Sequence, residues 1–190
     1  MKGALQFAFA GVVGLVLGAI VHLAAVFGIP ELGDRDAYSR FSPLSRESAA
    51  HLLTDADRAG AAPALRDPAV ATSVCAFDLA EGPVHVGVSV PGGFASVSVH
   101  RPGGGVIYAV TDRAAQRGAI DITLMTQDQL DEILAEDETG EPTQDLRVVS
   151  PVTRGLVVVR ALAALPSLRE RAEGIASTAT CKPLRAVDGG

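Results

Sequence analysis

The segment VHVGVSVPGGFASVSVHR, residues 84–101, alternates apolar residues with polar or small ones on both sides of a central turn. The apolar positions of both halves are spaced by two: Val84, Val86, Val88, Val90, Ala95, Val97 and Val99. A period of two is typical of a β-strand with one buried face. Pro91-Gly92-Gly93 is typical of a turn. The segment therefore predicts two antiparallel β-strands.

Further strands are expected on both sides of this segment. Short runs of the same kind occur at 74–79, 106–111, 119–125, 146–150 and 156–162, and turn residues separate most of them. Closely spaced strands with short turns are typical of an antiparallel meander. Thr126 with Gln129 resembles a capping box and predicts a helix to about Glu136. A second helix is expected between Ser167 and Ala179. The predicted fold class is α+β, with a mainly antiparallel sheet that curls into a sandwich or a partial barrel and with two helices.

The residues before this domain are of a different kind. From Gly3 to Ile29 no side chain is charged. A helix of this length measures about 40 Å, and a bilayer core of about 30 Å needs about 20 apolar residues. The apolar region of a cleaved signal peptide has about 7–15 residues, and this run is longer. An Ala-x-Ala cleavage site is also missing from the end of the run. An uncleaved transmembrane anchor is therefore favoured, and a cleaved signal is the alternative.

The flanks of the anchor predict its orientation. Lys2 precedes it, whereas Glu31, Asp34, Arg35 and Asp36 follow it. The positive-inside tendency places the N-terminus in the cytoplasm. We expect a protein of the bacterial inner membrane whose C-terminal domain is periplasmic.

Small and polar residues recur every four positions along the anchor: Gln6, Ala10, Gly14, Gly18 and His22. Residues at this spacing share one face of a helix. Small residues let a second transmembrane helix approach closely, so Ala10, Gly14, Gly18 and His22 are candidate helix-packing residues. The alternative is that Gly and Ala are simply common in an alanine-rich span.

The chain divides on these grounds into an anchor at 1–30, a polar connector with short helices at 31–70, a β-rich domain at 71–182 and a flexible tail at 183–190. Short connector helices are expected at 36–41 and within 45–58. The net charge of −6 argues against nucleic acid as a partner, because such binding depends on neutralising phosphates. No Trp is present, which disfavours carbohydrate binding.

The two cysteines, Cys75 and Cys181, both follow the anchor. An even number of cysteines in an oxidising compartment is most simply a disulfide. Cys75 alternates in phase with Phe77 and Leu79 and so faces a buried side. A Cys75–Cys181 disulfide is favoured over two free thiols.

Four residues are candidates for a ligand cleft: His85, His100, Asp112 and Arg113. If Val86 pairs with Val97, the two histidines share a polar face at about 7–8 Å. Two imidazoles do not make a metal site by themselves, so solvent-facing histidines are favoured. The Asp112-Arg113 pair follows an apolar strand, where it either lines a cleft or simply ends the strand.

No catalytic motif is recognisable. The sequence lacks a Gly-x-Ser-x-Gly elbow, and the run at 103–105 lacks the lysine of a phosphate loop. We expect no catalytic, cofactor-binding or metal-binding residues. A non-catalytic protein is favoured, and an enzyme is the alternative.

Two segments, DPAVATSVCAFDL at 67–79 and VIYAVTDR at 106–113, resemble short membrane-anchored members of the bacterial family called domain of unknown function 1254. The likeness extends through LRVVSP at 146–151 and GLVVVRAL at 155–162. The family has no established activity. The resemblance implies a β-rich fold and an envelope location, and it transfers no catalytic residue.

These observations favour a single-pass membrane protein whose periplasmic β-rich domain binds a membrane or periplasmic protein, as an accessory subunit of a membrane complex. The alternative is a periplasmic enzyme or small-ligand-binding protein with a cleft near His100 and Asp112.

Overall fold

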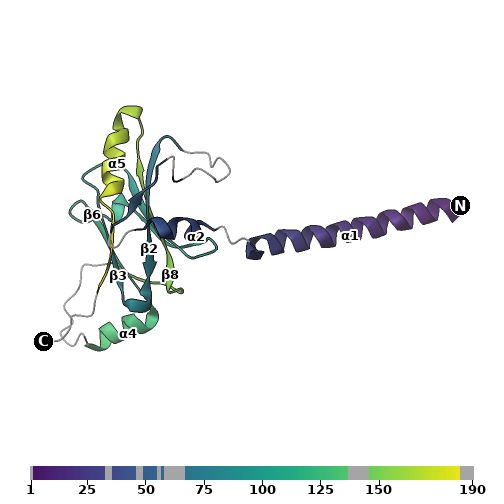
Figure 1. Ribbon diagram of the computed structural model, residues 1–190, viewed down its shortest axis with the longest axis horizontal. Helices are drawn as coiled ribbons and strands as arrows, with labels where there is room; N and C mark the ends of the chain where they lie inside the picture. The colour runs from purple at the N-terminus through teal and green to yellow at the C-terminus, as the bar shows by residue number, and fades with distance from the viewer. Residues whose placement is uncertain are drawn as a thin grey trace. The chain divides into compact units, whose positions relative to one another are not determined.

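The computed structural model describes residues 2–32, 36–45, 49–54, 57, 67–136 and 146–184. The chain divides into two compact units, Met1–Asp36 and Ala37–Gly190 (Figure 1). The first unit consists of the helix α1 (Lys2–Leu32). Its residues Gly3–Gly28 form a helix that is long and apolar enough to cross a membrane. The long apolar helix expected from the sequence is confirmed, and its length and composition fit both an anchor and a signal sequence.

The described part of the second unit contains two β-sheets. The first sheet is antiparallel throughout, and its strands follow the order β1 (His51–Leu52), β2 (Val70–Asp78), β8 (Arg154–Leu162), β4 (Ala95–His100) and β5 (Val106–Thr111). The second sheet has the order β7 (Leu146–Val149), β6 (Ala119–Met125), β3 (Val84–Ser89) and β9 (Thr180–Pro183). It is mixed, because β6 and β7 are parallel while the other pairs are antiparallel.

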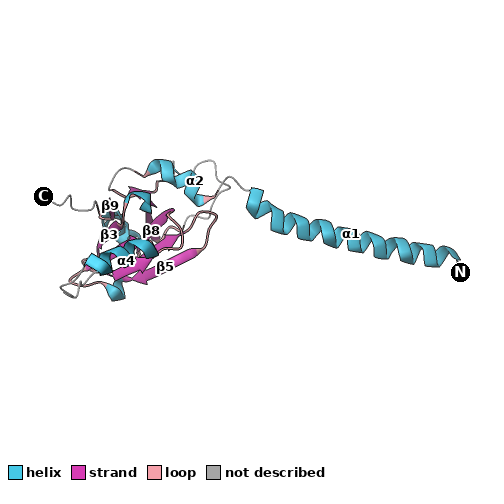
Figure 2. Ribbon diagram, turned by 90° about the horizontal axis from the view of Figure 1, so that it is seen from below, coloured by secondary structure: helices cyan, strands magenta, loops and turns pink. Residues whose placement is uncertain are grey.

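Three α-helices whose bounds the structure describes accompany the sheets: α2 (Ala37–Phe41), α4 (Gln127–Glu136) and α5 (Arg169–Ser177). The parallel strands β6 and β7 need a crossover connection, and α4 lies within it. In Figure 1, α4 and α5 lie at opposite ends of the second unit, and in Figure 2 β8 lies between α2 and α4, with β5 beside α4. The predicted α+β class is confirmed.

The core lies between the two sheets. The strands β3 and β4 bury alternate residues, as a period of two requires. The inner faces of β3, β4 and β8 meet in one apolar cluster: Val84, Val86, Val88, Ala95, Val97, Val99, Val157, Val159 and Ala161. Helix α5 adds Ala172, Ile175 and Ala176 to the same cluster.

The expected pairing of the 84–101 strands is wrong. β3 pairs with β6 and β9, whereas β4 pairs with β5 and β8, so the two strands lie in different sheets. Each strand carries a complete apolar face, and the two faces bury each other best from opposite sides of the core. Gly92 and Gly93, with φ of 134° and 98°, let the chain cross between the sheets.

The ends of the domain also differ from expectation. Within the predicted connector, α2 matches the expected first helix, but His51–Leu52 forms a strand because it pairs with Ser73 and Val74 of β2. Thr180–Pro183 forms β9, for which no strand was expected. Six of the fourteen residues of the second expected connector helix, 46–48, 55, 56 and 58, lie outside the described residues, as do residues 185–190 of the expected tail.

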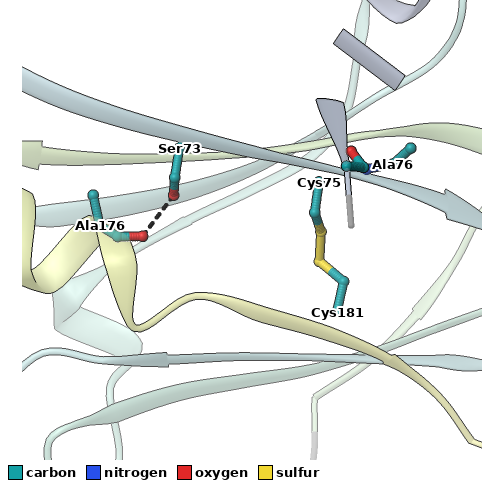
Figure 3. The surroundings of a disulfide bond; sticks show 6 residues. Ser73, Cys75, Ala76, Ala176 and Cys181 are labelled. Atoms are coloured by element: carbon teal, nitrogen blue, oxygen red, sulfur yellow. Dashed lines mark hydrogen bonds between the residues drawn. A yellow bond between two sulfur atoms is a disulfide. The ribbon is translucent and has the colours of Figure 1, made fainter. Parts of the chain in front are cut away.

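A disulfide between Cys75 on β2 and Cys181 on β9 crosses the core (Figure 3). Both residues are buried, and their Cα atoms lie 6.6 Å apart. Beside it, the Ser73 hydroxyl donates a 2.7 Å hydrogen bond to the Ala176 carbonyl, which ties α5 to β2. The predicted disulfide is confirmed, and it joins one sheet to the other.

Candidate functional site

The two candidate histidines lie in separate sheets. His85 is on β3, where its Nε2 atom lies 3.4 Å from Oδ1 of Asp121 on β6. His100 is on β4, where its Nε2 atom lies 2.9 Å from the Ser98 hydroxyl oxygen. Burial, and secondarily the charge of Arg160, lowers the pKa of His100 below its ordinary value. The shared polar face considered for His85 and His100 therefore does not form.

Asp112 and Arg113 lie in the 3₁₀ turn Asp112–Ala114 that follows β5. Ser96 is opposite Thr111 in the β4–β5 pair, and His100 lies four residues further along β4, which is about 13 Å. The hairpin therefore holds His100 and Asp112 at opposite ends. Oδ1 of Asp112 is buried and accepts no hydrogen bond from the described residues. Arg113 is exposed.

The second unit has a hollow of about 520 Å³ beside this turn. It lies between the β5 edge of one sheet and the β6–β7 side of the other. Its walls come from both sheets and the turns between them: Val110, Ala114, Gln116, Arg117, Ala119, Ile120, Asp121 and Leu146. Of the four candidate cleft residues, none lines the hollow, although Ala114 belongs to the same turn as Asp112 and Arg113.

The floor and rim of the hollow differ in chemistry. Val110 and Ile120 are buried aliphatic residues, whereas Gln116, Arg117 and Asp121 bring an amide, a guanidinium and a carboxylate. Arg117 has a φ of 53° and Gly118 a φ of 80°, as a tight hairpin turn requires. Such a hollow can bury an aliphatic group and hydrogen-bond a polar group beside it.

A second cluster, which the sequence analysis did not single out, surrounds Asp57. The Asp57 carboxylate accepts 2.7 Å hydrogen bonds from the Thr54 amide and the Thr54 hydroxyl, and it lies 3.1 Å from Nε2 of His51. The Thr54 hydrogen bonds, and then the neighbouring His51, lower the pKa of Asp57 to about 2. Thr-x-x-Asp is a capping-box pattern, so the sequence did carry a signal for this cluster.

The helix-packing candidates all lie on α1. Ala10, Gly14, Gly18 and His22 are exposed, and a Cβ added at Gly14 or Gly18 would meet nothing within 4 Å. Both glycines therefore accept larger side chains without a clash inside the helix. Their role in packing stays a prediction.

The described residues contain no group of three or more His, Cys, Asp or Glu side chains that could hold a metal ion. No protein-family model matches the chain, and no curated protein matches it.

Two solved structures are similar to this chain. The VPA0106 protein from Vibrio parahaemolyticus is 14% identical over 78% of this chain, with a TM-score of 0.53. An uncharacterised protein from Burkholderia cenocepacia is 12% identical over 72% of this chain, with a TM-score of 0.47. The matches cover 32% and 35% of those chains, so this chain spans about a third of their length. The likeness to the Vibrio protein shows a common fold.

Proposed function

We propose that the chain is a single-pass protein of a bacterial inner membrane, with its N-terminus in the cytoplasm and its β domain in the periplasm. In this proposal the β domain binds another protein, as a non-catalytic accessory subunit of a membrane complex. The observation that carries the proposal is the presence, in one chain, of an apolar helix long enough to span and a buried disulfide in the following domain.

The disulfide supports the placement of the β domain on the periplasmic side of the membrane. Cys75 and Cys181 are 2% and 7% exposed, so their bond belongs to the folded core. Disulfides persist in oxidising compartments and are rare in the cytoplasm. The positive charge of Lys2, the first residue of α1, agrees with this direction.

The open face of α1 supports a partner in the membrane. Ala10, Gly14 and Gly18 leave that face free of large side chains. Interfaces between membrane helices are enriched in residues of this size.

Labelling of an introduced cysteine tests the orientation. Ala164 is exposed, so Ala164→Cys adds a reactive thiol while the native disulfide stays intact. A membrane-impermeant maleimide should label this variant in spheroplasts, and the mass of the protein should include α1. Labelling only after the membrane is broken would contradict the orientation, and a protein lacking α1 would contradict the anchor.

A mild-detergent pull-down of the full-length protein tests the accessory role. A stoichiometric partner should co-purify, and Gly14→Leu with Gly18→Leu should release it. Ala8→Leu with Val16→Leu is the control, because both positions are offset by two residues from the stripe and so lie on the opposite face. A lone protein in wild-type membranes would contradict the proposal.

We also propose membership of the domain of unknown function 1254 family. The support is the four similar segments between residues 67 and 162. A sequence profile built from homologues of this chain should align with the family across these segments, and alignment with a different family would overturn the assignment.

A further inference from the structure

Among the described residues, four strands form the outer edges of the two sheets, and three of these strands are protected. β1 has only two residues, β7 carries Arg147, and β9 carries Lys182 and Pro183. Shortness, charges and proline are the devices that prevent pairing with another chain. β5 differs, because its six residues, VIYAVT, include neither a charge nor a proline, and because its bulge at Ile107, itself a protective device, leaves Tyr108–Thr111 regular.

The hydrogen-bonding direction of β4 determines which groups of β5 are available. Residues that oppose each other in an antiparallel pair exchange both backbone hydrogen bonds at every second position. The Leu162 amide donates to the Phe94 carbonyl, so the even-numbered residues of β4 bond to β8. The odd-numbered residues Val97 and Val99 therefore bond to β5.

On β5, the partners of these odd-numbered residues are Val110 and Tyr108. Ala109 and Thr111 alternate with them, so their backbone N–H and C=O groups point away from β4. A register shift precedes this part of the strand, at Ile107. Tyr108–Thr111 is thus a regular edge whose outward groups have no neighbouring strand among the described residues.

The hollow is continuous with this edge. Val110 of β5 forms one of its walls, and Ala114 follows two residues after the strand ends. A strand added beside β5 would direct alternate side chains to the inner face of the sheet. That face borders the hollow, whose floor includes the buried aliphatic residues Val110 and Ile120.

We propose that β5 binds an extended segment of a partner protein, which joins the five-stranded sheet as an additional strand and inserts an aliphatic side chain into the hollow. Main-chain hydrogen bonds supply affinity in such complexes, and pockets for side chains supply specificity. The inference rests on the proposed protein-binding function and names the surface. A foreign segment is favoured over a second copy because two chains of net charge −6 repel each other.

The test uses the full-length protein in detergent and a library of displayed heptapeptides. Peptides are selected on the wild type alone, and the binding of the selected peptides to the wild type is then compared with their binding to Ala109→Pro, which removes an outward amide and leaves the β4–β5 hydrogen bonds in place. Selected peptides should have an uncharged centre with an aliphatic residue. Their binding should slow hydrogen exchange at Ala109 and Thr111.

Two pairs of variants distinguish the contribution of the β5 edge to peptide binding from the contribution of the hollow. Ala109→Pro should weaken peptide binding about tenfold or more, whereas Ala109→Val should bind like the wild type. Ala114→Phe should fill the hollow and weaken binding, whereas Ala135→Phe, on the exposed side of α4, should not. Thermal unfolding of all four variants checks that they are folded.

Three results would overturn the inference. The first is that no peptide is enriched, and the second is that peptides bind Ala109→Pro as well as they bind the wild type. The third is a wild-type dimer that Ala109→Pro converts to a monomer, because this result would identify a second copy as the occupant. The pull-down with the α1 variants tests the accessory role independently of peptide binding at β5. A complex that survives Ala109→Pro would defeat this inference while leaving the proposed function standing.

Discussion

Cys75 and Cys181 are bonded across the core, with Cα atoms 6.6 Å apart and a sequence separation of 106 residues. Through them, β2 of the five-stranded sheet is joined to β9 of the four-stranded sheet. In the chain-entropy model a closed loop of about 100 residues stabilises the fold by about 4.7 kcal/mol.

Removing this bond should therefore be costly. Cys75→Ala with Cys181→Ala should lower the free energy of unfolding by about 2–5 kcal/mol. Urea unfolding of the full-length protein in detergent measures this difference. Wild-type protein under reducing conditions should unfold close to the double variant, and an unchanged urea midpoint would show that the sheets hold together without the bond.

Gly155 has no room for a side chain. A Cβ there would lie 2.6 Å from the Phe77 ring and would clash with the His100 carbonyl oxygen. Gly155→Ala should destabilise the domain by about 1–3 kcal/mol, because the surrounding backbone must move.

The matched control is Gly174→Ala in α5, where a Cβ meets nothing within 4 Å. That change should stabilise the protein by up to about 1 kcal/mol, since alanine is the better helix former. Thermal unfolding of both variants should give shifts of opposite sign. A stabilising Gly155→Ala would contradict the packing described for β2 and β8.

The capping box of α4 forms as the sequence predicts. The backbone amide of Gln129 donates to the Thr126 hydroxyl at 3.2 Å, and the backbone amide of Thr126 donates to Gln129 Oε1 at 2.9 Å. Thr126→Ala should cost about 0.5–2 kcal/mol and should speed hydrogen exchange in the first turn of α4. Glu132→Ala, at an exposed position of the same helix, should leave that exchange unchanged.

His100 should make stability depend on pH. Its pKa is lowered in the folded state, chiefly by burial, so the unfolded chain binds the proton more readily. Stability should therefore fall as the pH drops below the unfolded pKa of about 6.5. His100→Gln should reduce this slope between pH 7 and pH 5, and Arg160→Gln should raise the His100 midpoint in an NMR titration. A midpoint at or above the ordinary value would contradict the burial of the ring.

Local patterns predicted much of this fold. The period of two located β3 and β4, and the Thr126–Gln129 pair located the start of α4. Alternation of Cys75 with Phe77 indicated a buried sulfur, which the disulfide confirms. Each of these features depends on residues close together in sequence.

The assignment of strands to sheets was not predictable in the same way. β3 and β4 are consecutive, and their apolar faces could be buried either in a hairpin or in two different sheets. The pairing of β3 with β6 and of β4 with β8, which are distant in sequence, decides between these arrangements. The hollow escaped prediction for the same reason, since Val110 and Leu146 meet there from different sheets. His100 and Asp112 were expected near one cleft, but the β4–β5 pairing separates them.

The long pairing of β2 with β8 constrains when the domain can form. Val70–Asp78 lies opposite Arg154–Leu162, and β9 with Cys181 comes later still. Such distant pairings form slowly, because a large loop must close before they are gained. A chain made from its N-terminus onward therefore holds β2 without its main neighbour until nearly all of its residues have emerged. We expect nascent chains that stop before Arg154 to remain protease-sensitive and to depend on a holding chaperone.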